Sequence, residues 1–150
     1  MTNVKRVPLV SLRLVRERTL SYAAALSGPA AAAALAIDLL EDRDREHFVS
    51  IFLDTKHRPL GVEISSVGTA NACLVSPGVV FRAALLTGAV AAVFAHNHPS
   101  GDTIPSPEDF ELTRVLCDAG RLIGVRVLDH LVIGSDWQSI RELRPNLNWD

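Results

Sequence analysis

Two histidines separated by one residue, His96 and His98, are the side chains that point most directly to chemistry. Because strand side chains alternate between two faces, both imidazoles are expected on one side and Asn97 on the other. Imidazole nitrogens bind zinc, and a carboxylate serves as a further ligand in many zinc sites. Asp109, in the first turn of the next predicted helix, is the candidate for that ligand. The spacing therefore predicts a site for one metal ion, held by His96, His98 and Asp109.

Each part of this pattern also has an ordinary structural explanation. Histidine pairs at strand ends are often surface or capping residues. Ser106, Pro107 and Asp109 stand where a stable helix start places a cap, a first-turn proline and an acid. The conjunction is more specific, because His-x-His, seven residues and Ser-x-x-Asp follow a predicted buried strand and open a predicted helix. We therefore favour the chemical interpretation.

The order His-x-His-x7-Ser-x-x-Asp resembles the JAMM (MPN-plus) metalloprotease signature. The segment HNHPSGDTIPSPEDFELT, with VLDHLVIG further on, resembles the RadC family of JAB domains in particular, and the resemblance extends from about Phe48 to Gly134. It implies a JAB/MPN domain with a deaminase-like α/β fold. It also implies zinc, held by the two histidines and the aspartate, and hydrolysis of a peptide or isopeptide amide bond by a metal-activated water.

Two catalytic residues follow from the same resemblance. In the family a glutamate from an upstream strand polarises the water, and by position this is Glu63, the only acid between Asp54 and Asp102. The alternative is that Glu63 is a solvent-facing residue of a half-exposed strand. Ser106 is expected to stabilise the oxyanion of the tetrahedral intermediate, to cap the helix, or to do both.

Asp129 and His130 form a second tier of candidates. They either orient a zinc-binding imidazole through its other nitrogen or form a local structural hydrogen bond, and the sequence favours neither reading. Cys73 and Cys117 are interpreted as small buried hydrophobic residues.

The surrounding pattern predicts an α/β fold, with a mixed β-sheet and roughly three flanking helices. Prolines stand at expected first helical turns and glycines near expected ends. Helices are expected over 30–41, 77–88 and from 106 to 120 or 124, and strands over 47–53, 60–67, 72–75, 90–95 and 125–133, with a long polar loop over 98–105.

The sequence predicts that the chain is divided into an N-terminal arm and one domain. Residues 1–46 are interpreted as a basic N-terminal arm and leader helix, and residues 47–150 as the RadC-like JAB/MPN domain. The first 18 residues hold five basic side chains against one acid, Glu17, so the arm either contacts an acidic partner or is simply solvated. Residues 19–37 carry no charge, but their alanine content and the Gly28-Pro29 break argue against a membrane span.

Composition sets the remaining limits. With 150 residues and 48% hydrophobic residues, the chain is expected to bury one real core. Two cysteines exclude a disulfide framework and zinc sites of three or four thiolates, and they suit a reducing cytoplasmic compartment. A net charge of -2 does not favour nucleic acid as a partner over the whole surface. The expected partner is a peptide or protein substrate, and the oligomeric state is left open.

The sequence argues against two other classes of metal-dependent enzyme. A zinc nucleobase deaminase requires H-x-E and P-C-x-x-C, and neither string occurs. The adjacent letters of His96-Asn97-His98 do not indicate an HNH nuclease, whose residues are spread over a ββα-metal unit. The alternative to a hydrolase is a non-catalytic RadC-like accessory module in DNA repair or mobile-element biology. Longer family members carry a helix-hairpin-helix region before the domain, and no Gly-hairpin pair is recognisable in residues 1–46.

Overall fold

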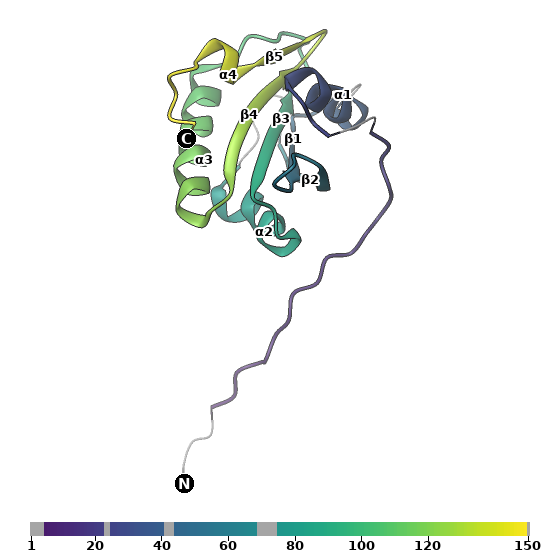
Figure 1. The fold of residues 1–150 in the computed structure, drawn as a ribbon, viewed down its shortest axis with the longest axis vertical. Coiled ribbons are helices and arrows are strands. Elements are labelled where there is room, and N and C mark those ends of the chain that lie inside the picture. Colours follow the sequence, from purple (N-terminus) through teal and green to yellow (C-terminus); the bar gives the residue numbers. More distant parts are fainter. Residues whose placement is uncertain (1–4, 23–24, 41–43, 69–74, 150) are drawn as a thin grey trace.

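A five-stranded mixed sheet forms the centre of the computed structural model, which describes residues 5–22, 25–40, 44–68 and 75–149 (Figure 1). The strands are β1 (His47–Leu53), β2 (Pro59–Val67), β3 (Ala91–Asn97), β4 (Arg126–Ile133) and β5 (Trp137–Ser139). Their order across the sheet is β2-β1-β3-β4-β5. Only β3 and β4 pair in parallel, and the other neighbours are antiparallel.

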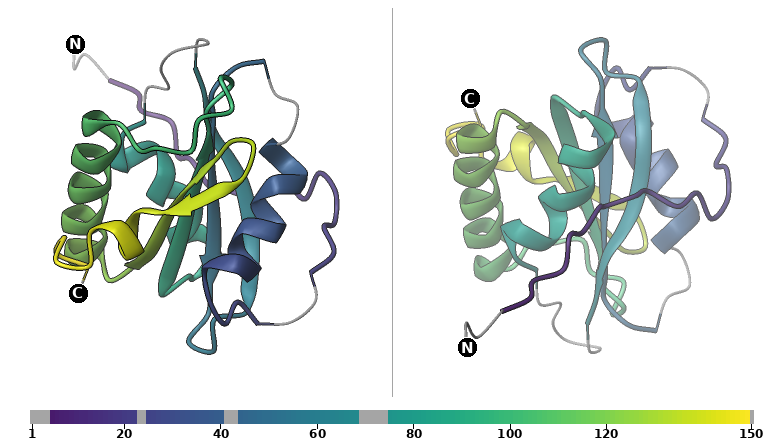
Figure 2. Two further views of the ribbon diagram at one scale, coloured as in Figure 1. Left: turned by 90° about the horizontal axis from the view of Figure 1, so that it is seen from above. Right: turned by 90° about the horizontal axis from the view of Figure 1, so that it is seen from below.

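Helices cover both faces of this sheet. The helix α1 (Pro29–Leu40) lies on one face, while α2 (Pro77–Thr87) and α3 (Pro107–Ile123) lie on the other (Figure 2). A short helix, α4 (Ile140–Leu143), follows β5. The α/β class with a mixed sheet and flanking helices, expected from the sequence, is thereby confirmed.

Two apolar clusters, one on each face, hold the layers together. Along β1, Phe48 and Phe52 belong to the cluster on the α2 and α3 side, whereas Val49, Ile51 and Leu53 belong to the cluster that includes α1. This alternation is the period of two that a strand imposes. Because helices cover both faces, every residue of β1 and of β3 is buried. The apolar run predicted as a doubly buried strand is therefore confirmed in β3.

The connection between β3 and β4 positions the chemistry. Parallel neighbours need a crossover, and α3 provides it. The carboxyl end of β3 and the first turn of α3 therefore lie at the same edge of the sheet. β1 runs antiparallel to β3, so the segment entering β1 reaches that edge as well.

The structure adds elements that the sequence pattern did not predict. β5 has three residues and α4 has four, too short for a recognisable hydrophobic period. The strand predicted over 72–75 lies largely outside the described residues. α1, predicted as part of a leader, buries six residues against the sheet beside Leu26, so it contributes to the same core.

The N-terminal segment contains no helix or strand over the described residues 5–22; residues 13–20 and Tyr22 border a pocket together with residues of β2 and α2, and toward the N-terminus the chain leaves the domain (Figure 1). Its apolar side chains between Val7 and Val15 are largely exposed, and Leu9 is fully so. Within the described parts of the chain, no helix is both long and apolar enough to cross a membrane.

Candidate metal centre

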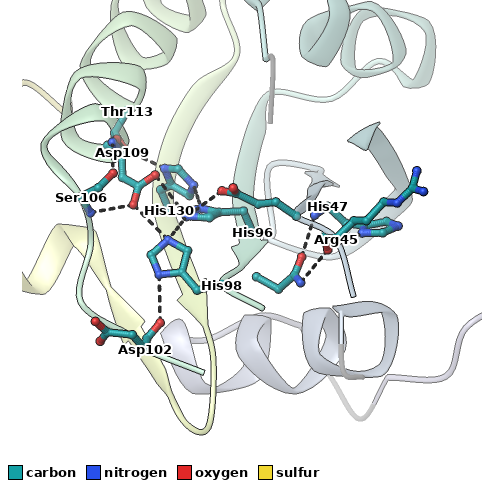
Figure 3. Close-up of polar contacts among 11 residues, drawn as sticks. Arg45, His47, His96, His98, Asp102, Ser106, Asp109, Thr113 and His130 are labelled. Atoms are coloured by element: carbon teal, nitrogen blue, oxygen red, sulfur yellow. Dashed lines mark hydrogen bonds and ion pairs between the residues drawn. The ribbon is translucent and has the colours of Figure 1, made fainter. Parts of the chain in front are cut away.

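Four side chains with metal-binding atoms meet at this edge of the sheet: Glu46, His96, His98 and Asp109. One ligand atom from each lies within 4.8 Å of the others. His96 comes from the end of β3, His98 directly follows that strand, and Asp109 lies in the first turn of α3 (Figure 3). Glu46 immediately precedes β1.

The structure thus brings together the two histidines and the aspartate selected from the sequence, and adds Glu46. We refer to this group as the four-residue cluster.

The spacing of the ligand atoms suits a small cation. His96 Nε2 lies 3.1 Å from His98 Nε2 and 3.2 Å from Asp109 Oδ1, and His98 Nε2 lies 3.3 Å from Asp109 Oδ2. A tetrahedral ion with bonds of about 2.0–2.1 Å separates its ligand atoms by about 3.3 Å. The donor set, two imidazoles with carboxylates, is one that zinc prefers. The residues present therefore fit a zinc-like divalent cation.

Asp109 is oriented by the start of its own helix. The Ser106 N–H donates to Asp109 Oδ2 at 2.8 Å, and the Asp109 N–H donates to Ser106 Oγ at 3.1 Å, which completes a capping box. Burial raises the pKa of Asp109, but the neighbouring rings of His96 and His98 and the Ser106 N–H outweigh burial and hold this pKa well below its usual range. Asp109 is therefore an anion throughout the neutral range.

His98 is oriented by the loop that follows it. Its Nδ1 lies 2.9 Å from the Asp102 carbonyl oxygen. Since a carbonyl only accepts, the Nδ1–H donates, and Nε2 is left to face the cluster. The hydrogen bond to Asp109 raises the pKa of His98 above its usual value, although partial burial opposes the rise.

This raised pKa predicts how metal affinity depends on pH. A protonated Nε2 cannot bind a metal, so a cation must displace a proton from His98 at every pH below the raised pKa. Apparent affinity should therefore increase by about tenfold per pH unit for each displaced proton, and become constant above that pKa. Competition with a chelator between pH 5.5 and 8.5 measures this slope. An affinity independent of pH across the range would contradict it.

His96 is in contact with a buried histidine. Its Nδ1 lies 2.8 Å from His130 Nε2, and the other nitrogen of His130 lies 2.7 Å from Thr113 Oγ1 (Figure 3). Burial lowers the pKa of His130 well below its usual value. Asp129 instead accepts hydrogen bonds from Ser139 Oγ and from nearby backbone N–H groups. Of the two second-tier residues, His130 contacts the cluster, whereas Asp129 stabilises local structure.

Glu63 does not lie with the four-residue cluster. It pairs with Ser50 in β1, and Ser50 pairs with Phe94 in β3, whereas His96 pairs with Phe48. Two strand spacings, roughly 10 Å, separate its strand from β3. Its carboxylate accepts a hydrogen bond from the Ser65 hydroxyl at 3.3 Å.

The carboxylate beside the histidines belongs to Glu46. Its Oε1 lies 3.8 Å from His96 Nε2. Burial raises the pKa of Glu46 above its usual value, more than the two neighbouring histidines lower it. In the sequence, Glu46 is the last residue of a charged run, 41–46, that follows the main part of the predicted first helix. The available signal was its place directly before β1, which pairs antiparallel with β3.

Asn97 holds the backbone on both sides of Glu46. The His47 N–H donates to Asn97 Oδ1 at 2.7 Å, and Asn97 Nδ2 donates to the Arg45 carbonyl at 2.9 Å. The side chain is 4% exposed, the hydrogen bond to His47 is buried, and the one to Arg45 is partly buried. The residue between the two histidines therefore ties the end of β3 to the segment that carries Glu46.

Comparison with known proteins agrees with this geometry. The model of the RadC-like JAB domain matches residues 26–145. A UPF0758 protein of Desulforudis audaxviator is 47% identical over 108 residues, 72% of this chain and 47% of that protein. UPF0758 proteins of Acaryochloris marina and Methanosarcina acetivorans are 44% and 42% identical over 78% and 67% of this chain, and over 49% and 44% of their own lengths. The chain thus spans about half the length of these relatives. It belongs to the RadC-like JAB domain family.

Proposed function

We propose that the protein is a zinc-dependent hydrolase of JAMM type that cleaves a peptide or isopeptide amide bond in a peptide or protein substrate. The observation that supports this proposal is the meeting of two imidazoles and two carboxylates at one sheet edge. Three of these groups suffice to hold a cation, which leaves one carboxylate for proton transfer. That division of roles is what hydrolysis by an activated water requires.

The roles follow from position. His96, His98 and Asp109 would hold the cation. When bound, a zinc ion supplies a water of lowered pKa and polarises the substrate carbonyl. Glu46 accepts a proton from the water and donates it to the leaving amine. Its raised pKa suits this exchange, because a general base works best when its pKa approaches the operating pH.

Ser106 can serve the helix and the reaction together. Its Oγ accepts the Asp109 N–H as a cap, and this bond leaves the hydroxyl proton of Ser106 available. That proton can be donated to the oxyanion that develops during amide hydrolysis. The two roles considered for Ser106 are therefore compatible.

A substrate screen tests the proposal directly. The zinc-loaded protein is incubated with a peptide library and with isopeptide-linked peptides, and products are identified by mass spectrometry. Cleavage should cease when a chelator removes the metal and return when zinc is restored. No cleavage of either bond type, or cleavage that survives complete removal of the metal, would contradict the proposal.

Replacing Asn97 with alanine should disturb Glu46 without touching a ligand. The change leaves the Arg45 carbonyl and the His47 N–H without their buried partner, which should lower the free energy of unfolding by about 1–3 kcal/mol. Urea unfolding measures this loss. Zinc content should stay near that of the unaltered protein, while turnover falls. Unchanged stability and turnover would show that the Asn97 bonds do not position Glu46.

A further inference from the structure

We propose that Thr113 and His130 together fix the tautomer of His96 and keep its Nε2 lone pair free for a metal ion. The inference rests on the proposed metal site and deepens it. Neither residue belongs to the four-residue cluster, and both are 0% exposed. They act as positioning residues, through hydrogen bonds alone.

The direction of the hydrogen bonds is set at Thr113. Its hydroxyl lies 2.6 Å from the Asp109 carbonyl oxygen and 2.7 Å from His130 Nδ1. The hydroxyl has one proton, and a carbonyl oxygen has none to give. The short contact with Asp109 therefore takes the threonine proton. Consequently Thr113 Oγ1 must accept a proton from His130 Nδ1.

The ring of His130 carries a single proton, and its position follows from the contacts of the ring. This ring packs against both Phe48 and Phe94, whose centroids lie 5.3 and 6.4 Å from its own. A doubly protonated imidazole is costly in such apolar surroundings, so the ring carries one proton, on Nδ1. His130 Nε2 is then an acceptor, and the group 2.8 Å from it, His96 Nδ1, is the donor.

His96 is left with its proton on Nδ1 and an unprotonated Nε2. That nitrogen faces His98 and Asp109, at 3.1 and 3.2 Å. The chain of bonds starts from the backbone carbonyl of Asp109, whose carboxylate is the third expected ligand. The first turn of α3 therefore orients one ligand directly and selects the tautomer of another.

Without the Thr113 hydroxyl the two rings can exchange roles. His130 can then hold its proton on Nε2 and donate to His96 Nδ1, which moves the His96 proton to Nε2. A proton on Nε2 blocks metal binding, and Asp109 Oδ1 is close enough to accept it. The Thr113 hydroxyl disfavours this arrangement because it would set two lone pairs against each other at 2.7 Å.

The variants Thr113→Val and Thr113→Ser test the proposal. Valine keeps the shape of the side chain and removes the hydroxyl, while serine restores the hydroxyl. A matched control is Thr87→Val, because Thr87 makes the same kind of hydrogen bond to backbone carbonyls of its own helix, those of Ala83 and Ala84. Zinc dissociation constants are measured by competition with a chromogenic chelator. Imidazole 15N NMR of the metal-free protein at pH 8.5 reports the His96 tautomer.

Thr113→Val should bind zinc about 10- to 100-fold more weakly, with the His96 proton shifted toward Nε2. Thr113→Ser and Thr87→Val should match the unaltered protein. Folded Thr113→Val with unchanged affinity would overturn the proposal. If valine prevents folding, the unaltered protein still decides, since a neutral His96 protonated on Nε2 refutes it. His96→Ala separates the two hypotheses: undiminished zinc binding in that variant would refute the metal site itself.

Discussion

Glu46→Gln is expected to lower the rate of hydrolysis by orders of magnitude and to leave zinc bound. The amide has nearly the shape of the carboxylate but cannot accept the proton of the attacking water. Loss of a general base typically lowers kcat by about 10²- to 10⁴-fold. His96, His98 and Asp109 remain in place, so the metal content should stay close to one zinc per chain. Turnover of a substrate from the peptide screen, with metal analysis of the same sample, measures both quantities.

Glu63→Gln is the matched control, since it makes the same chemical change on a strand that does not reach the cluster. Its turnover should equal that of the unaltered protein. The resemblance of the sequence to the JAMM signature assigns the base to Glu63, and the geometry favours Glu46, so the pair decides between them. Loss of turnover in Glu63→Gln with full turnover in Glu46→Gln would restore the first assignment.

The second large effect is expected on metal content. His96→Ala and Asp109→Asn should each reduce bound zinc from close to one per chain to nearly none. Asparagine is preferred to alanine at position 109 because its side-chain oxygen can still accept the Ser106 N–H and cap α3. The zinc content of the desalted protein is measured by inductively coupled plasma mass spectrometry, and circular dichroism checks the fold.

The control for these variants is His57→Asn. His57 lies in the turn before β2 with φ of 56°, a left-handed conformation that asparagine tolerates well. The His57→Asn substitution removes an imidazole from the chain without disturbing the four-residue cluster, so zinc should be retained in full. Stoichiometric zinc in both His96→Ala and Asp109→Asn would show that these residues are not the ligands.

Local patterns predicted much of the fold. The β-branched and aromatic run over 47–53 coincides with β1, and Gly88 and Gly124 end helices in the left-handed conformation. The His-x-His spacing anticipated that the two imidazoles share a side, because a strand alternates with a period of two. The proline and acid after Ser106 anticipated the start of α3.

Long-range pairing could not be read in this way. Glu46 stands in a charged run that is typical of a helix end, and it reaches the cluster through contacts distant in sequence, such as the pairing of Phe48 with His96. Glu63 matched a motif by its order in the chain, but the sheet places β2 at an edge, with β1 between it and β3. The hydrogen bonds of Asn97 are to the backbone of Arg45 and His47, about 50 residues away in the sequence. Those of Thr113 are to the Asp109 carbonyl one turn earlier and to the distant His130.

At the end of β3, His96 and His98 face the cluster while Asn97 faces the backbone of residues 45–47. This alternation makes the end of the strand intolerant of a change in length. One insertion before His96 would rotate every later side chain by half a period, so that the amide would replace an imidazole at the cluster and the histidines would meet the backbone of residues 45–47. Metal ligation and the anchoring of Glu46 would fail together. In engineering this domain, these three consecutive positions must therefore keep their spacing as well as their residue types.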